Sequence, residues 1–504
     1  MSFHFIAQRE LRVSARRKST YYARGGAALL GVVIAGFYML LFTLTGPSST
    51  GLGHYMFTIL AGYALLTTLL AGIFLASDCL SVERREGTLG LLFLTDLKGY
   101  EVVLGKFMAV SLNAFYGLLA VFPVLALCLL TGGVAGAEFW RTCLALLNIM
   151  FLSVTGGMLI SSFCQSASRA MAGSIALLAT WLGATFAASG TGLDYVNKIS
   201  PFEPCFFVLD AEYFRGAREF WESLAFSHLT GWFFLAWAGW RLRTFVDTSK
   251  RSGAWTRVFT RNLTGFCAAR RARLLDVNPV LWLLDDSRKL RWVAWLLSLV
   301  AVAVLIFLGE VGSVPLFSSG LPMWPFYFLL KIFFAIQACR FFSETRRTGA
   351  LELLFCTPLT MREVVAGQWM VLRRVFLWPL IILLSANAVA LVYSASKGAG
   401  TWGAAGSNPL PFEILSLYFN FKVIPNTVAD FLAIGWFGMW LALCLQRPNM
   451  AAGLTILSVV ILPMIAVCVP TVATDAIFIV VGWVKLSEDF RLRQAQWTIR
   501  KPTG

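Results

Sequence analysis

Residues 81–107 read SVERREGTLGLLFLTDLKGYEVVLGKF, and residues 343–369 repeat that pattern as SETRRTGALELLFCTPLTMREVVAGQW. The two stretches align without a gap at a constant spacing of 262 residues. The identical pairs include Ser81/Ser343, Arg84/Arg346, Arg85/Arg347, Gly87/Gly349, Leu92/Leu354, Phe93/Phe355 and Gly105/Gly367. A gapless match of this density indicates a duplicated unit. Both stretches are polar interruptions between long apolar runs, so we expect them to lie at a membrane surface.

Composition predicts the class of protein. The chain has 504 residues, of which 58% are hydrophobic and 13% are charged, whereas soluble domains carry about 25% charged residues. Many apolar runs approach or exceed the roughly 20 residues that a membrane-spanning helix needs. Alternating ten-residue segments, which would indicate a membrane β-barrel, are not visible. The sequence therefore predicts an all-α polytopic membrane protein.

Basic residues predict the orientation. The formal net charge is +16, and most Lys and Arg fall in segments that would share one side of the membrane, as the positive-inside rule requires. We therefore expect both termini and both repeated stretches in the cytoplasm of a prokaryotic cell, with the chain in its inner membrane. Residues 1–24 form a basic amphipathic segment suited to anionic lipid. The positive-inside distribution accounts for the net positive charge, so the charge does not indicate that the protein binds nucleic acid.

Spacing of the apolar runs predicts about twelve spans in two sets of six. The predicted spans are 26–45, 55–77, 108–131, 140–163, 170–189, 224–242, 292–309, 324–341, 375–393, 428–446, 449–469 and 472–486. The domains are then a first six-span unit (1–242), a basic cytoplasmic connector (243–291) and a second six-span unit (292–504). Each repeated stretch follows the second span of its unit. Large outer loops are expected at 190–222, which is acidic and aromatic, and at 394–427.

Each repeated stretch reads as two short helices joined by a turn. Leu89, Leu92 and Phe93 recur at helical spacing and form an apolar stripe. In the second copy, Thr360 and Glu363 predict a capping box that opens the next helix. The first copy has Lys98 in place of Thr360, so its cap must differ. A helix of this kind in the membrane plane could be pushed from the cytoplasm.

These motifs resemble the cytoplasmic signature of type-2 ATP-binding-cassette (ABC) exporter permeases, which is roughly E-x-x-x-G-T-L-E-x-L-x-x-x-P-x-x-x-x-E-x-x-x-G-K. The resemblance covers both halves. It implies a six-span unit with a coupling helix between its second and third spans, two units forming one pathway, and ATPase subunits, two copies here, docked on the coupling helices. The residues it assigns to ATPase coupling are Glu83, Glu86, Gly87, Thr88, Leu89, Leu92, Glu344, Gly349, Leu351, Glu352 and Leu354.

Departures from that signature predict two unequal docking sites. Gly90 replaces the acidic residue that the second copy keeps as Glu352, and Gln368 replaces Lys106. The chain itself is not expected to hydrolyse ATP, because its nearest approach to a P-loop, Gly99–Phe107, has one residue too many and Phe in place of the hydroxyl residue that binds Mg²⁺. ATP and Mg²⁺ would thus bind to the partner, and this chain would need no cofactor.

Isolated polar residues indicate less about function than the two repeated stretches do. The ten Cys are scattered without a CxxC motif, and the three His lie far apart, so neither a disulfide framework nor a metal site is expected. Lys331 falls near the middle of a predicted span, where insertion costs about 3 kcal/mol. It either faces a cavity or a partner, as part of a possible pathway, or lies nearer the interface with its stem extended towards water.

Three classes of function are considered for this sequence. The first is the exporter permease. The second is a non-transporting membrane platform that relays ATPase motion to an envelope partner, and the aromatic outer loops at 190–222 and 394–427 favour it. The third, a membrane-embedded enzyme, lacks a visible catalytic cluster.

Overall fold

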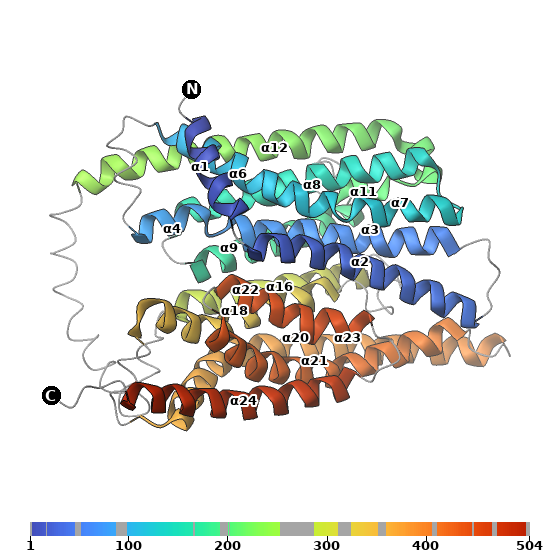
Figure 1. Cartoon of the computed structure of the whole chain (residues 1–504). Coiled ribbons are helices and arrows are strands. Elements are labelled where there is room, and N and C mark those ends of the chain that lie inside the picture. The colour runs from blue at the N-terminus through green and yellow to red at the C-terminus, as the bar shows by residue number, and fades with distance from the viewer. Residues whose placement is uncertain are drawn as a thin grey trace. The chain divides into compact units, whose positions relative to one another are not determined.

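A computed structural model gives the architecture of the chain (Figure 1). It describes residues 3–16, 18–45, 52–86, 98–164, 167–191, 200, 202–251, 287–310, 324–350, 359–405, 411–445, 448–465 and 471–499. Within these ranges the regular elements are all helices, and no strand occurs. Contacts divide the chain into two compact units, residues 1–256 and 257–504. The division lies inside the segment predicted as a connector, most of which is outside the described ranges.

The first unit begins with a short helix and contains several long apolar ones. Its elements are α1 (Phe3–Ala15), α2 (Lys18–Thr45), α3 (Leu52–Ala71), the π-helix η2 (Gly72–Ala76), α4 (Cys79–Glu86), α6 (Gly99–Leu119), α7 (Phe122–Thr131), α8 (Gly136–Phe163), α9 (Ala167–Thr191), α11 (Glu203–Phe206) and α12 (Asp210–Arg251). Helix α8 lies at its centre, in contact with α3, η2, α4, α6, α9 and α12. It is the most buried of the candidate membrane spans in this unit.

The second unit is built around α18 (Trp324–Thr348). Its other elements are α16 (Ser287–Glu310), α20 (Met361–Ala405), α21 (Pro411–Cys444), α22 (Pro448–Ile456), the π-helix η4 (Leu457–Ile461), α23 (Leu462–Ile465) and α24 (Thr471–Ile499). Helix α18 packs against α16, α20, α21 and α22, and α21 also packs against α24. Phe326, Phe333 and Phe342 of α18 are fully buried, which explains the central place of this helix.

Seven described helices are long and apolar enough to cross a membrane: Thr20–Leu40, Gly53–Arg84, Gly99–Thr131, Gly136–Phe163, Pro325–Arg346, Met361–Ala390 and Val423–Cys444. Two further apolar helices, Leu290–Ile306 and Met450–Ile461, are shorter. The expectation of an all-α protein with membrane-spanning helices is therefore confirmed. The arrangement of twelve spans in two sets of six stays a prediction.

The interval 394–427, which was predicted as a large outer loop between two spans, has a largely helical backbone. Helix α20 continues to Ala405 and α21 begins at Pro411, so most of the interval is helical. The end of an apolar run shows where the hydrophobic stretch stops, but helical hydrogen bonding continues through the polar residues that follow. In the interval 190–222, the structure has α11 and the first turns of α12, which bends at Gly216.

Candidate functional site

Glu83 and Lys106 join the two ends of the first repeated stretch. Glu83 lies in α4 and Lys106 in α6, on either side of residues 87–97, which are outside the described part of the chain. The Lys106 Nζ lies 2.8 Å from Glu83 Oε1, and both side chains are less than a tenth exposed. A buried pair of this kind holds α4 against α6, because separating the two charges would leave each without its partner.

The N-terminal helix α1 adds two more charges to this pair. Arg9 Nη2 lies 3.7 Å from Glu83 Oε1, and Glu10 Oε1 lies 3.6 Å from Lys106 Nζ. Arg9 also donates a hydrogen bond of 3.0 Å to Glu10. These four side chains, Arg9, Glu10, Glu83 and Lys106, are called the Lys106 cluster. Helix α1 packs against α6, so the cluster fastens the basic amphipathic segment of the sequence to both ends of the repeated stretch.

Arg84 attaches the same stretch to the end of α8. Its guanidinium donates to the carbonyl oxygens of Ser162 at 2.8 Å and Cys164 at 3.4 Å. The hydroxyl of Ser161 accepts hydrogen bonds of 3.0 Å from the backbone N–H groups of Leu80 and Ser81. The last carbonyls of a helix have no partner within the helix and carry partial negative charge, so an arginine is well suited to bind them.

The second repeated stretch makes the same contact. Arg346, which the 262-residue spacing pairs with Arg84, donates to the carbonyl oxygens of Leu443 at 2.5 Å and Cys444 at 2.6 Å. These carbonyls end α21, as Ser162 and Cys164 lie at the end of α8. The two copies therefore repeat a tertiary contact as well as a sequence pattern.

The Glu83–Lys106 pair, in contrast, is absent from the second copy. The corresponding residues are Thr345 and Gln368, which are 7% and 1% exposed. The Thr345 hydroxyl donates a hydrogen bond of 2.8 Å to the carbonyl oxygen of Phe341. The Gln368 amide donates one of 3.0 Å to the carbonyl oxygen of Gln337. Both members of the ion pair have thus been replaced by neutral polar residues, and neither replacement leaves a buried charge.

The helices that follow the two stretches begin differently, as predicted. The capping box at Thr360 and Glu363 is confirmed. The Thr360 N–H donates a hydrogen bond of 2.7 Å to Glu363 Oε2, and the Glu363 N–H donates one of 3.4 Å to Thr360 Oγ1. In the first copy, the Lys98 N–H donates a hydrogen bond of 3.0 Å to Glu101 Oε2. The Lys98 side chain has no acceptor atom, so this helix keeps only half of the box.

The residues predicted to couple to an ATPase lie partly outside the described ranges. Gly87, Thr88, Leu89, Leu92, Leu351, Glu352 and Leu354 are in those outside segments, and Glu86 is described only as the last residue of α4. Glu83 is buried in the Lys106 cluster, whereas Glu344 is half exposed and accepts 3.1 Å from Arg340 Nε. Gly349 follows the end of α18 with a φ of +73°, a conformation that favours glycine.

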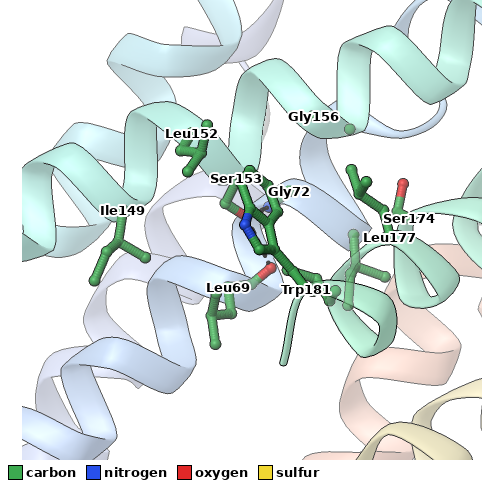
Figure 2. Close-up of a pocket in the computed structure, with 12 residues that line it drawn as sticks. Leu69, Gly72, Ile149, Leu152, Ser153, Gly156, Ser174, Leu177 and Trp181 are labelled. Atoms are coloured by element: carbon green, nitrogen blue, oxygen red, sulfur yellow. Dashed lines mark hydrogen bonds between the residues drawn. The ribbon is translucent and has the colours of Figure 1, made fainter. Parts of the chain in front are cut away.

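A π-helix lies between the second apolar helix of the first unit and α4. Ser153 of α8 inserts beside this π-helix (Figure 2). Its hydroxyl accepts a hydrogen bond of 3.1 Å from the Gly72 N–H and donates one of 3.1 Å to the Leu69 carbonyl oxygen. An inserted side chain of this kind stabilises an interruption of the helical hydrogen bonds. The adjacent cavity has a volume of about 20 Å³, which is enough for one water molecule.

Lys331 has a charged partner. Its Nζ lies 2.5 Å from Asp430 Oδ2 of α21, and both side chains are almost buried. This contact agrees with the expected partner and not with a side chain extended towards water. A role in a pathway stays a prediction.

Sequence reasoning missed Asp430, Arg9, Glu10 and the Glu83–Lys106 pair. The joint change from Glu83/Lys106 to Thr345/Gln368 was visible in the alignment of the two copies and could have indicated that pair.

Cys205 gives a prediction about chemical reactivity. It lies in α11 and packs against a cluster of Ala145, Val208 and Phe220. Burial raises the pKa of its thiol to about 12. The thiolate, which is the reactive form, is therefore scarce at pH 7, and we expect Cys205 to resist maleimide in the folded protein and to react after unfolding in detergent. Peptide mass spectrometry checks this, and rapid labelling of the folded protein would contradict it.

Comparison with known proteins yields no further assignment: no family model matches the chain, and no curated protein matches it.

Proposed function

We propose that this chain is the membrane-embedded permease subunit of a type-2 ABC exporter in a prokaryotic cell membrane. In this proposal both termini and both repeated stretches face the cytoplasm, and two ATPase subunits, which bind ATP and Mg²⁺, dock on those stretches. The repeated contact of Arg84 and Arg346 carries the proposal. In both copies, the stretch that resembles a coupling helix is bonded directly to the end of another long apolar helix.

Force on either stretch would then reach two helices of its unit. In the first unit, α4 continues from α3 through η2 and is bonded to α8 by Arg84. In the second unit, α18 runs without interruption to Thr348, and Arg346 bonds it to α21. Closure of the ATPases would move these helix pairs and open the pathway. The π-helix η2 gives the first unit a point of bending just before its stretch.

The two docking sites are unequal in this proposal. The first is fastened by the Lys106 cluster to α1, whereas the second has neutral Thr345 and Gln368 at the corresponding positions. We therefore expect the first stretch to move together with α1 and the second to move without an ionic connection of this kind. The sequence difference between Gly90 and Glu352 supports the same inequality.

The purified chain is expected to hydrolyse no ATP, and Glu86→Ala or Gly349→Leu is expected to abolish its association with the ATPase. Glu86 ends α4 at the edge of the proposed docking surface, and leucine at Gly349 would strain a backbone with a φ of +73° by about 1–3 kcal/mol. Co-purification of this chain with a candidate ABC ATPase, expressed in the same cells, measures association.

Matched controls separate docking from general damage. Glu212→Ala removes an exposed carboxylate of α12, and Gly453→Leu places a side chain where a Cβ meets no atom within 4 Å. Both are expected to leave association unchanged. Full association of both Glu86→Ala and Gly349→Leu would count heavily against the proposal.

A non-transporting platform is the second candidate. The observation that favours it is a group of exposed aromatic side chains at the start of α12 and in α11, namely Phe206, Phe214 and Trp221, which are 63%, 81% and 52% exposed. Such side chains suit a partner outside the membrane. An efflux assay in vesicles that contain this chain and its ATPase distinguishes the two: ATP-dependent export supports the permease, and ATPase activity without export supports the platform.

A further inference from the structure

Three ionisable side chains meet inside the second unit. They are Lys331 of α18, Asp430 of α21 and Asp475 of α24, and together they are called the Asp475 cluster. The Lys331 ammonium lies 2.5 Å from Asp430 Oδ2. Asp475 is close enough for electrostatic interaction with both. Two members lie near the N-terminal ends of their helices: Lys331 is seven residues from the start of α18, and Asp475 is four residues from the start of α24. Asp430 lies farther inside α21, which begins at Pro411.

Asp475 is the unusual member of the cluster. Its side chain is fully buried, at 0% exposure, and Asp430 is 7% exposed. Neither carboxylate oxygen of Asp475 receives a hydrogen bond from an N–H or hydroxyl donor among the described residues. The carboxyl group of Asp430 is within hydrogen-bonding reach, but two carboxyl groups can bond to each other only when one of them is protonated. An ionised carboxylate with neither water nor a donor is strongly unfavourable, and such a group binds a proton instead.

Counting the charges leads to the same conclusion. One ammonium can balance one of the two carboxylates, so the cluster carries a net charge of −1 if both are ionised. Neighbouring elements do not balance it within the described side chains: Arg373 and Arg374 of α20 and Arg291 of α16 are exposed, and α22, η4 and α23 contain no charged residue. One retained proton makes the cluster neutral.

A metal ion fits this cluster less well than a proton. The position next to Asp430 that a cation would take is already held by the Lys331 ammonium. A hard cation also needs about six oxygen ligands, and the described residues contain no group of three His, Cys, Asp or Glu that could hold a metal.

Polar atoms continue from the cluster towards the N-terminal ends of the helices. Asn426 precedes Asp430 by one helical turn, and Thr471 precedes Asp475 by one turn. The Asn426 Oδ1 and the Thr471 Oγ1 are buried, and neither has a hydrogen-bond partner among the described residues. Buried polar atoms of this kind are normally bonded to water, so they mark a route by which a proton could reach Asp475.

We propose that Asp430 and Asp475 form a proton-binding site inside the second unit, with Lys331 as its fixed counter-charge. One carboxyl group holds the proton while the three helices are together, and it releases the proton when water enters or Asp475 moves away from Asp430. The α8–α12 contact of the first unit has one cation and one anion in its ion pair, Arg141 and Asp210. Elsewhere in this contact Asn148 donates a hydrogen bond of 2.5 Å to Ser227 and lies 3.1 Å from His228 Nδ1. The proposed site lies within the second unit, and it does not depend on the proposed export activity.

Infrared difference spectroscopy of the full-length chain in lipid nanodiscs tests this site. The C=O stretching band of a protonated carboxyl group is expected at pH 7 and is expected to disappear in Asp475→Asn, because the remaining Asp430–Lys331 pair is neutral without a proton. In Lys331→Met, both carboxyls should be protonated and the band should rise about twofold, since neither charge then has a partner. Thr471→Val should slow hydrogen–deuterium exchange of the band without removing it.

Glu488→Gln is the matched control, because it removes an exposed carboxylate from the same helix, α24, and should leave the band unchanged. If Asp475→Asn does not fold, the wild-type chain is treated with dicyclohexylcarbodiimide, which modifies protonated carboxyls in apolar surroundings. Labelling of Asp475 or Asp430 at pH 7 supports the site. A band that is identical in wild type and Asp475→Asn, or an absence of labelling at both residues, would overturn it.

Discussion

Lys106→Met is expected to lower the free energy of unfolding by about 3 kcal/mol, because it leaves the buried carboxylate of Glu83 without its closest partner. Arg9 remains 3.7 Å from Glu83 but is 59% exposed, so it compensates only in part. Thermal unfolding in detergent micelles measures the loss. If the proposed ATPase docks on this stretch, the same variant should also reduce its binding, since α4 and α6 are then no longer held together at the ends of the first repeated stretch.

The double variant Glu83→Thr/Lys106→Gln separates the charge effect from the effect of altering the site. It places the neutral residues of the second copy into the first, and we expect it to be within about 1 kcal/mol of wild type, because no buried charge is left alone. The reverse pair, Thr345→Glu with Gln368→Lys, is the matched control in the second unit. If the double variant is as unstable as Lys106→Met, the Lys106 cluster is not the cause.

Gly157→Leu is expected to prevent folding of the first unit. A Cβ at Gly157 would lie 2.4 Å from the Gly72 carbonyl oxygen, and one at Gly72 would lie 2.2 Å from the Ser153 hydroxyl. These neighbours include backbone, which cannot move aside without separating α8 from η2. Gly157→Ala should already cost about 1–3 kcal/mol, and leucine more. The yield of monodisperse protein after detergent extraction and its unfolding temperature measure both effects.

Gly62 provides the control for this contact. It lies in α3, ten residues before Gly72, and a Cβ there meets no atom within 4 Å. Gly62→Leu is expected to change stability by less than about 1 kcal/mol. Equal effects of leucine at Gly62 and at Gly157 would show that the close approach of α8 and η2 is not what makes glycine necessary.

The sequence predicted the helical class well because apolar runs of this length have few alternatives in a bilayer. It also predicted the cap at Thr360 and Glu363, since both partners lie within one turn and local chemistry decides the contact. The Glu83–Lys106 pair was not predicted. Its residues lie 23 positions apart and meet only because α4 and α6 pack together, which no local pattern encodes.

Asp430 and Asp475 were missed for a related reason. Each is the single charged residue in the apolar run of its helix, and their closeness follows from the packing of α21 against α24. Lys331 alone drew attention in the sequence, because a lysine in a span is costly by itself. The apolar runs indicated where membrane spans would end, but not how far the helices α20 and α21 extend beyond them.

The replacement of an ion pair by two neutral residues bears on how the duplicated halves diverged. Changing only Glu83 or only Lys106 leaves one buried charge alone, so a descendant with one change would be less stable than either end state. The two copies could therefore exchange these states only through a poorly folded intermediate, or by two changes at once. Once the halves differed, selection for stability would have opposed any exchange of sequence between them that transferred only one of the two positions.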